Sequence, residues 1–488
     1  MLKHTRLAST LLLTVFSSAS ALAQTPPPEA VPSQAPVVVG PSPLAPSEAP
    51  PPAEAPAAPS LPAAPEQKAT APALTVSPPT APQVATAVPA PPPVALASMG
   101  PKGLTLQSED ARFSFNLRFP FMFDAKATLN NNQPRNGDAF FPRFFGPIFT
   151  VTLYKAVTGK LIVGFQDKQV TVVNAWFDVA AHPLLHLRLG KFLYPIALER
   201  QVLPLKAVLL EHGIASSLLP VSEFGAQLWG ATPNKVFEYQ LTFGNGAPTN
   251  QHYETDLDTG KDGVARAYLR PFARTGVEGI AGLGLGFGAS YGIRRGSVAN
   301  PLTGNHRTLG GRTFFQTAAN AQDPTGTAFA DGKVVRLVPQ LGYIGGPVSL
   351  VAEYVRLTER LNKGGVKDTL THQSVHGIFS LVLTGEKAVL LDIVPPKRPF
   401  DLAAGQFGAL ELVGRFEHVD FDDDTFPTYA NPARSAQSAT AIGGGFNWIP
   451  TEIIRVMLNY EHTQFGAAKG AKKLRAEELL GLRVQALF

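Results

Sequence analysis

The sequence predicts an all-β protein, a transmembrane antiparallel β-barrel that follows a disordered segment rich in proline and alanine. Two observations favour this class. Apolar and polar residues alternate over many stretches of about ten residues, the pattern of strands with two unlike faces. After the N-terminal leader, no run approaches the ~18 apolar residues of a membrane-spanning helix, so a membrane protein of this sequence must be a closed barrel.

The alternation is clearest in residues 112–125, RFSFNLRFPFMFDA. Every second position carries a large apolar side chain: Phe113, Phe115, Leu117, Phe119, Phe121 and Phe123. Arg118 lies on the opposite face. In a soluble barrel the apolar residues would face a core, whereas in an outer-membrane barrel they face lipid and the polar residues face the lumen. The same alternation recurs in 184–191, 236–243, 264–272, 334–343, 409–418 and 453–463.

Residues 1–23 have the features of a signal peptide. Lys3 and Arg6 precede an apolar run from Leu7 to Phe16, and Ala21-Leu22-Ala23 forms a small-x-small cleavage site. The sequence contains no cysteine, so neither a disulfide nor a lipid on cysteine can form. Export from the cytoplasm is therefore expected.

Residues 24–100 form the predicted disordered linker. Of the 45 prolines, 23 lie between Thr25 and Ser98, and such a composition cannot bury a core. As polyproline II it could extend on the order of 230 Å. A passive spacer is the simpler interpretation, and a contact with peptidoglycan or a periplasmic partner is the alternative.

Residues 101–488 form the predicted barrel domain. From Met99 onwards the chain has a net charge of +6, with 39 of the 42 Lys and Arg and 33 of the 37 Asp and Glu. This mildly basic balance is far below that of a nucleic-acid-binding protein.

The last strand ends on a free aromatic residue, Phe488, after Leu480, Leu482, Val484 and Ala486 on the same face. This ending resembles the assembly signal of Gram-negative outer-membrane proteins. It favours the lipid-facing interpretation and implies the barrel-assembly machinery, outer-membrane lipid and lipopolysaccharide as partners.

Four blocks together resemble the phosphate-selective porin O and P family: 188–230, 381–401, 409–424 and 443–465. Within the first block, RLGKFLYPIALERQ is followed by LLEHGIASSLLP and FGAQLWG. The resemblance implies a homotrimer of 16-stranded barrels in the outer membrane, each with a long loop folded into the lumen as a constriction. It does not extend to the first 100 residues.

The constriction loop implied by the resemblance is 193–221. Its polar side chains are Glu199, Arg200, Lys206, Glu211 and His212. The stretch LPLKAVLLEHG within it is mostly apolar, which argues against strong phosphate selectivity.

A pore selects ions through fixed charges that replace part of the water around the ion. The alternation predicts a set of lumen-facing arginines: Arg118, Arg188, Arg266, Arg270, Arg336, Arg415, Arg455 and Arg483. Guanidinium groups match phosphate and carboxylate oxygens. For any single arginine, the simpler interpretation is a pair with a lumen carboxylate: Glu238, Glu411, Glu417 or Glu461.

Catalytic and metal-site motifs have weak support. GASYG at 288–292 matches a nucleophile elbow, but Ser290 lies in a glycine-alternating strand instead of a strand-to-helix turn. The inward-facing small residues of this strand would leave room for the constriction loop. His182 and His186 flank Pro183, and 254–263 starts like a calcium loop without its final glutamate. The sequence predicts neither an enzyme nor a cofactor.

The sequence thus predicts a passive outer-membrane porin for small solutes with a mild preference for anions such as phosphate. The alternative is a structural or adhesive barrel with a plugged lumen, which links envelope layers through its Pro/Ala-rich segment.

Overall fold

A computed structural model describes residues 96–130, 138–166, 169–251, 255–320 and 323–488. All of them belong to one compact unit, Val88–Phe488. The predicted signal peptide and all but the last five residues of the predicted linker lie outside the described residues. Regular structure is present from Leu96, within the final residues that the sequence assigned to the linker.

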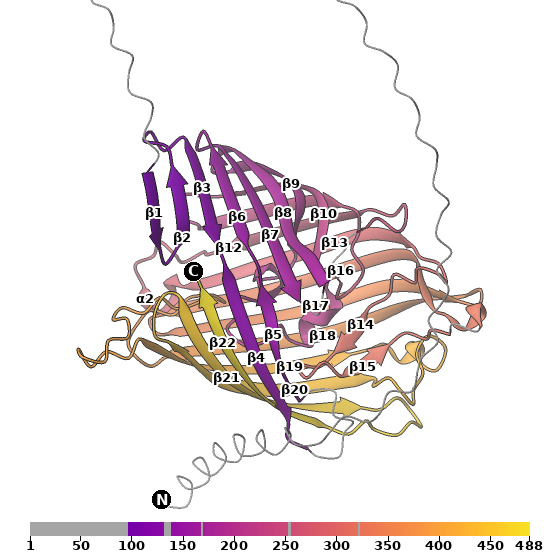
Figure 1. Cartoon of the computed structure of the whole chain (residues 1–488). Helices are drawn as coiled ribbons and strands as arrows, with labels where there is room; N and C mark the ends of the chain where they lie inside the picture. Colours follow the sequence, from indigo (N-terminus) through magenta and orange to yellow (C-terminus); the bar gives the residue numbers. More distant parts are fainter. Residues whose placement is uncertain (1–95, 131–137, 167–168, 252–254, 321–322) are drawn as a thin grey trace, which may run out of the picture. The chain divides into compact units, whose positions relative to one another are not determined.

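The structure is almost entirely antiparallel β-sheet (Figure 1). The first strands are β1 (Leu96–Gly100), β2 (Gly103–Gln107), β3 (Phe113–Arg118), β4 (Pro120–Thr128), β5 (Ala139–Phe145), β6 (Ile148–Leu153), β7 (Val157–Gln166), β8 (Gln169–His182), β9 (Leu185–Leu193), β10 (Ser222–Ala231) and β11 (Phe237–Gly244). The later strands are β12 (Asp262–Leu269), β13 (Leu283–Arg295), β14 (Asn305–Arg307), β15 (Thr313–Gln316), β16 (Phe329–Gly345), β17 (Val348–Lys363), β18 (Val366–Val382), β19 (Ala409–Asp420), β20 (Ser438–Ile449), β21 (Ile454–Gly466) and β22 (Glu477–Leu487). The helical turns are η2 (Glu199–Gln201), η3 (Ala215–Leu218), α2 (Glu278–Ala281), η4 (Pro324–Gly326) and η5 (Asp423–Thr425). No helix in the described ranges is long and apolar enough to cross a membrane.

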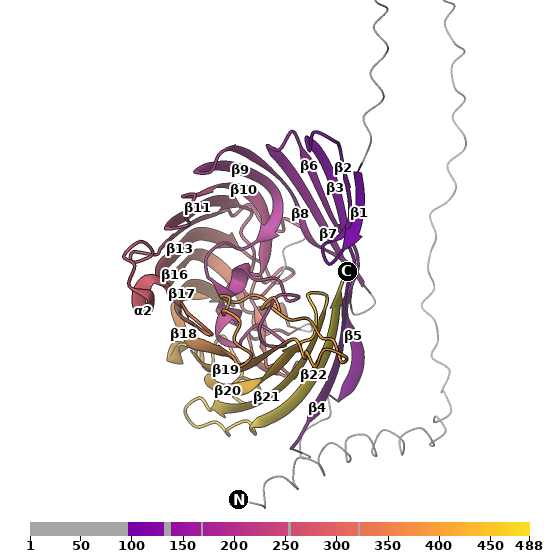
Figure 2. The same ribbon diagram turned by 90° about the vertical axis from the view of Figure 1, so that its left-hand side faces the viewer.

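Sixteen strands close into a ring, which confirms the predicted antiparallel β-barrel. β3 and β4 together form the first barrel strand, with Phe119 between them, and β5 and β6 form the second. The ring closes where β22 pairs with β4, from Leu487 opposite Pro120 to Leu479 opposite Thr128. The hairpin β1–β2 lies outside this ring and pairs with β3 through β2 (Figure 2).

The opening stretch has the two predicted faces. Phe113, Phe119, Phe121 and Phe123 are each more than a third exposed on the outer face. Met122 and Asp124, which alternate with them, are buried on the inner face. The outer face of the ring therefore carries large apolar side chains, as a lipid-facing surface requires.

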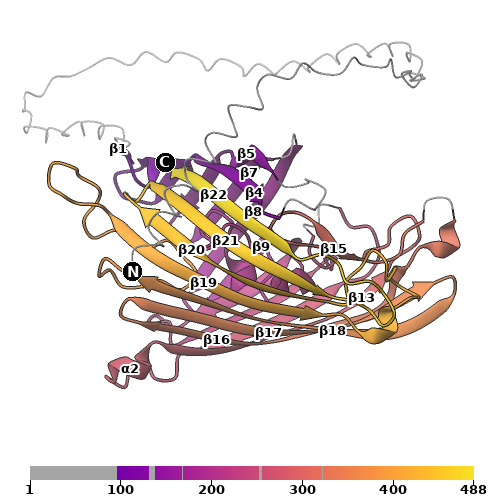
Figure 3. The same cartoon turned by 90° about the horizontal axis from the view of Figure 1, so that it is seen from below.

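The connections differ in length between the two ends of the barrel. One end has short turns at 154–156, 183–184, 232–236, 346–347 and 450–453. The other end has most of the long loops: 129–138, 194–221, 245–261, 296–328, 421–437 and 467–476. The end with the short turns also has two longer connections, 270–282 between β12 and β13 and 383–408 between β18 and β19. Figure 3 shows β16–β22 side by side as one part of the wall.

The core lies inside the barrel, where 194–221 and part of 383–408 pack against the wall (Figure 2). Leu205 joins a buried cluster with Met122 and Ile162 of the wall. Leu210 joins a second cluster with Met457 and Leu479. The apolar residues that looked unusual in a pore loop therefore fill the interior and are not exposed to lumen water.

Candidate functional site

The loop 194–221 lies inside the barrel as an irregular segment with two short 3₁₀ turns, η2 and η3. Pro195 and Pro220 lie near its two ends and have no backbone N–H to donate to a strand ladder. The loop therefore leaves the sheet with many backbone polar groups that need partners in the barrel interior.

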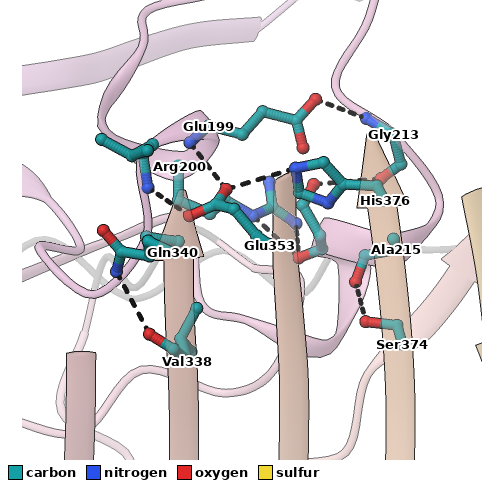
Figure 4. Close-up of polar contacts among 12 residues, drawn as sticks. Glu199, Arg200, Gly213, Ala215, Val338, Gln340, Glu353, Ser374 and His376 are labelled. Carbon is teal, nitrogen blue, oxygen red and sulfur yellow. Dashed lines mark hydrogen bonds and ion pairs between the residues drawn. The ribbon is translucent and has the colours of Figure 1, made fainter. Parts of the chain in front are cut away.

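Inward-facing side chains of the wall supply some of these partners at the start of the loop (Figure 4). The Glu353 carboxylate accepts hydrogen bonds from the backbone N–H groups of Leu198, at 2.6 Å, and Glu199, at 3.0 Å. Gln340 donates from Nε2 to the Ile196 carbonyl at 2.6 Å. Glu353 also contacts Nε2 of His376 at 3.2 Å. One carboxylate of β17 thus fixes the first turn of the loop.

The end of the loop is held in the same way by β18 and β19. Ser374 donates from Oγ to the Ala215 carbonyl at 2.7 Å (Figure 4), and Glu417 accepts from the Ala215 N–H at 2.9 Å. Arg415 donates from Nη1 to the Glu211 carbonyl at 2.8 Å. These wall groups satisfy the loop backbone and do not face water.

The middle of the loop has four further wall contacts, all to its backbone. They are Asn447 Nδ2 to the Val208 carbonyl at 2.9 Å, the Leu210 N–H to Asn459 Oδ1 at 2.8 Å, Gln485 Nε2 to the Leu205 carbonyl at 2.8 Å and Arg455 Nη2 to the same carbonyl at 3.2 Å. The inward-facing polar side chains of β16–β22 therefore form a receptor for this loop.

Two of the predicted constriction residues, Glu199 and Arg200, are buried. The Glu199 carboxylate accepts from the Gly213 N–H at 3.0 Å, and Arg200 donates from Nε and Nη2 to the Ser216 carbonyl at 2.9 and 2.6 Å. Burial opposes the charge on Glu199, but His376 and other nearby cations outweigh it and lower the pKa of Glu199 to about 2. Burial lowers the pKa of Arg200 to about 10. Both therefore stay charged near neutral pH and hold the loop together.

The Glu211 carboxylate reaches cations of β4 and β5, and His212 is its neighbour in the loop. Arg143 donates from Nε and Nη2 to both Glu211 carboxylate oxygens, at 2.6 and 3.0 Å, and Lys126 lies 3.6 Å away. Burial opposes the charge, but these cations hold the pKa of Glu211 well below its usual range. Burial lowers the pKa of His212 to about 4, so its imidazole is neutral at neutral pH.

Lys206 differs from the other four loop residues because it is 43% exposed. Its Nζ lies 2.7 Å from Oδ2 of Asp392, which belongs to the connection 383–408. This ion pair joins two segments that enter the interior from opposite ends of the barrel.

The structure divides the eight predicted lumen arginines into two groups. Five are 5% exposed or less: Arg266, Arg336, Arg415, Arg455 and Arg483. The other three, Arg118, Arg188 and Arg270, are partly exposed.

The buried arginines bind wall or loop groups. Arg483 donates from Nε and Nη2 to both oxygens of Asp124, at 2.7 and 2.8 Å. The others pair as follows: Arg415 with Glu417 and Glu461, Arg336 with Asp262, Arg266 with Gln340 and Gln240, and Arg455 with Gln485. Outside the buried group, Arg270 lies 3.5 Å from Glu238. Glu411 accepts from Asn447 and has no arginine partner among the described residues. In this conformation the five buried guanidinium groups do not face open lumen.

A partly exposed basic set lies on the other side of the interior: Arg118, Lys160, Arg188 and Lys206. Arg118, Arg188 and Lys206 are each close enough to Lys160 to interact with it electrostatically. Arg188 pairs with Asp178 at 3.0 Å, and Lys206 pairs with Asp392. Lys160 and Arg118 have no acidic partner in the described part of the chain. Lys160 was missed in the sequence, although its place two residues after Thr158 in VTGKLIVG puts it on the inner face.

A second group that the sequence missed is a buried ion pair between Arg294 and Asp262. Arg294 donates from Nη1 and Nη2 to the two Asp262 oxygens at 2.7 and 2.8 Å. Asp262 is the first residue of β12 and is buried on the inner face, so the end of the stretch 254–263 belongs to the barrel wall. Arg294 continues the inward positions of Ser290 and Gly292, which was the signal available.

The motifs with weak catalytic or metal support have structural roles. Ser290 lies on β13, where it is opposite Arg336 in the sheet. His186 Nδ1 contacts Asp178 at 2.9 Å, and His182 accepts from the Leu184 N–H in a turn. Within the described ranges, no group of three or more His, Asp or Glu residues could hold a metal ion.

Comparison with known proteins gives one family. The model of the family described as phosphate-selective porin O and P matches residues 166–488. No curated protein sequence matches.

Several solved outer-membrane proteins are similar in structure at low sequence identity. The channel DcaP of Acinetobacter baumannii is 11% identical, with a TM-score of 0.48, over 78% of this chain and 99% of that one. OmpT of Vibrio cholerae is 10% identical, with a TM-score of 0.47, over 77% and 98%. The anion-selective porin from Comamonas acidovorans is 9% identical, with a TM-score of 0.44, over 77% and 100%.

Proposed function

Because the chain belongs to the phosphate-selective porin O and P family, we propose that it forms a water-filled channel with a mild preference for small anions, phosphate included. Membership of this family supports an outer-membrane porin channel.

The observation that carries the proposal is the exposed basic set Arg118, Lys160, Arg188 and Lys206. An inward-facing side chain that is still partly exposed must border open lumen. Asp178 and Asp392 offset two of the four charges, which leaves the charges of Lys160 and Arg118 unbalanced. A positive surplus in a narrow aqueous path raises the local concentration of anions.

The preference should be mild because the receptor side of the wall adds little free charge. Its buried arginines contact carboxylates, amides, the Thr249 hydroxyl or the loop backbone, so they cannot bind a passing solute without losing those contacts. Strong phosphate selection would need more free guanidinium groups than the described lumen offers.

We further propose that the loop 194–221 narrows the lumen and that Lys206 is the residue of this loop that solutes meet. The other four predicted residues, Glu199, Arg200, Glu211 and His212, position the loop. We also propose that the protein is a homotrimer and that it is exported through residues 1–23. Assembly would use Phe488, and residues 24–100 would contact another layer of the envelope. Phe119 donates from N–H to the Phe488 carbonyl, so the chain end is fixed to the first barrel strand.

A plugged barrel is the second candidate, and the packing inside the barrel favours it. Leu391 of 383–408 joins a buried cluster with Val208 and Leu209 of the loop. The cavity lined by Glu199, His212 and Leu391, among others, is only ≈ 10 Å³, about the space of one water molecule. In this alternative, the two segments would close the lumen entirely.

Single-channel recording of the full mature protein in a planar bilayer under a KCl gradient distinguishes the two candidates. A porin gives discrete steps with an anion-selective reversal potential, and Lys160→Gln should shift that potential toward neutrality. Lys235→Gln, in the turn 232–236, is the matched control and should leave it unchanged. Insertion without conductance would favour the plugged barrel, and cation selectivity would contradict the proposed charge preference.

A further inference from the structure

An aromatic cluster surrounds Arg188 on the inner face of the wall. Two of the three tryptophans of the chain take part, Trp176 on β8 and Trp229 on β10. The Arg188 guanidinium carbon lies 4.3 Å from the ring centre of Trp176 and 5.2 Å from that of Trp229. Both distances are within the range of a cation–π interaction.

Asp178 fixes the orientation of this cluster. Its Oδ2 accepts from Arg188 Nε at 3.0 Å and from Trp229 Nε1 at 2.6 Å, and its Oδ1 contacts His186 Nδ1 at 2.9 Å. Arg188 Nη1 donates to Gln227 Oε1 at 3.3 Å. Two hydrogen bonds and two cation–π contacts thus leave the guanidinium little freedom to rotate.

The free part of the guanidinium is the edge that carries Nη2. Nη2 has no hydrogen-bond partner among the described residues, and the side chain is 21% exposed. Trp176 is also partly exposed, and it lies directly across from Lys160 in the sheet. A preoriented donor, an apolar ring and a lysine without an acidic partner therefore border the same part of the lumen.

We infer that Arg188, Trp176 and Lys160 form a subsite for flat aromatic carboxylates, an inference that rests on the proposed anion channel. The carboxylate of such a solute pairs with Nη2 of Arg188 and with Nζ of Lys160. Its ring lies against the exposed part of the Trp176 indole, where stacking adds to the charge interaction. Inorganic phosphate has charge but no apolar face, so it gains nothing from the indole.

Block of the ion current tests the inference on the full mature protein. The probes are benzoate, cyclohexanecarboxylate and inorganic phosphate. The first two share one carboxylate and a six-membered ring, but only the benzoate ring is flat. We expect the half-blocking concentration of benzoate to be about fivefold below that of cyclohexanecarboxylate, the ratio that ~1 kcal/mol of stacking gives.

Two variants locate the effect. Trp176→Leu should remove the benzoate advantage, whereas Trp176→Phe should keep part of it because a ring remains. Trp448→Leu is the control, since Trp448 lies on the outer face and donates to the Phe407 carbonyl. Wild-type protein gives the ratio of the two ring acids even if a variant does not fold.

The outcomes separate this inference from the proposed function. An anion-selective reversal potential with equal block by benzoate and cyclohexanecarboxylate would overturn the subsite and leave the anion channel standing. A benzoate advantage that Trp176→Leu does not reduce would also overturn it. Absence of conductance or cation selectivity would instead remove the channel on which the subsite depends.

Discussion

The two sides of the barrel interior use the same alternation for different purposes. On β16–β22 the inward polar side chains bind the backbone of 194–221 and are buried. On β3–β9 several inward polar side chains remain partly exposed, among them Arg118, Lys160 and Arg188. The comparison shows that an inward-facing charge stays partly exposed only where no loop covers it. Charge on the receptor side supports the loop, and in the proposed function solutes meet the charge on the exposed side.

The largest effect on stability is expected for the ion pair that joins the receptor side to the first barrel strand. Arg483 of β22 and Asp124 of β4 are directly opposite and fully buried. Arg483→Met leaves a buried carboxylate without its main partner and should lower the free energy of unfolding by about 3–5 kcal/mol. Urea unfolding of the barrel in detergent, followed by tryptophan fluorescence, measures this.

Two further variants make that prediction specific. Arg270→Met removes a partly exposed pair with Glu238 and should cost at most about 1 kcal/mol. Adding Asp124→Leu to Arg483→Met should recover much of the lost stability, because no unpaired carboxylate remains. Equal destabilisation by Arg483→Met and Arg270→Met would contradict the distinction between the buried and exposed sides.

The next largest effect is expected when the first turn of the loop 194–221 loses its contact with the wall. Glu353→Ala leaves the N–H groups of Leu198 and Glu199 without their acceptor, at a cost of about 2 kcal/mol. The loop should then leave the wall, so single-channel conductance should rise and proteases should cut 194–221 in intact protein. Glu353→Gln keeps one acceptor oxygen and should have a smaller effect. Conductance unchanged in Glu353→Ala would show that the loop does not limit the current.

Two glycines of the wall, Gly288 on β13 and Gly414 on β19, test the loop contact through side-chain volume instead of charge. A Cβ on Gly288 would lie 2.0 Å from the Ile196 carbonyl oxygen, which is backbone and cannot rotate away. Gly288→Ala should therefore displace the loop and destabilise the barrel by about 1–3 kcal/mol. Gly414→Ala is the matched control, since nothing lies within 4 Å of its Cβ. Equal stability and conductance of the two variants would contradict the close approach of the loop.

The sequence predicted the faces of the strands but not what covers them. Alternation fixes which side chains point inward, because the side-chain period of a strand is two. The small inward residues around Ser290 predicted room for a loop, and the structure places Ile196 against Gly288.

The periodicity of the strands does not predict the path of an irregular loop. Long-range contacts such as Leu210 with Asn459 and Asn447 with Val208 determine that path. One signal was available, because Met122, Ile162 and Met457 are apolar residues at inward positions. Apolar inward residues are out of place against water, and with the apolar stretch LPLKAVLL they indicate a packed interior.

The exposed side was harder to predict for another reason. The matched family residues begin at 166, so Arg118 and Lys160 lie before them. The resemblance implied the constriction loop, and the alternation predicted eight inward arginines, five of which are buried. Only the structure shows which inward side chains of the earlier strands remain partly exposed. That exposure distinguishes the free charges from those that are neutralised.

The smallest effect is a pH dependence of the loop. Burial lowers the pKa of His212 to about 4; Arg200 and Arg415 add to the decrease, while Glu199 and Glu211 oppose it. Its usual pKa is about 6.5, so between these values a released loop binds a proton that the packed loop does not. The contribution of His212 to loop packing is therefore complete above pH ~6.5 and declines as the pH falls toward about 4.

Acidification from pH 7.5 to 5 should consequently raise the frequency of open-loop current fluctuations in a planar bilayer. His212→Gln removes this proton uptake and should weaken the pH response, because the other titrating groups remain in place. His182→Gln, at the exposed end of β8 beside the turn 183–184, is the control and should respond to pH like the wild type. The same pH response in His212→Gln and wild-type protein would assign the effect to other groups. A weaker response in His212→Gln would show that one neutral, buried imidazole helps to hold the loop against the receptor side.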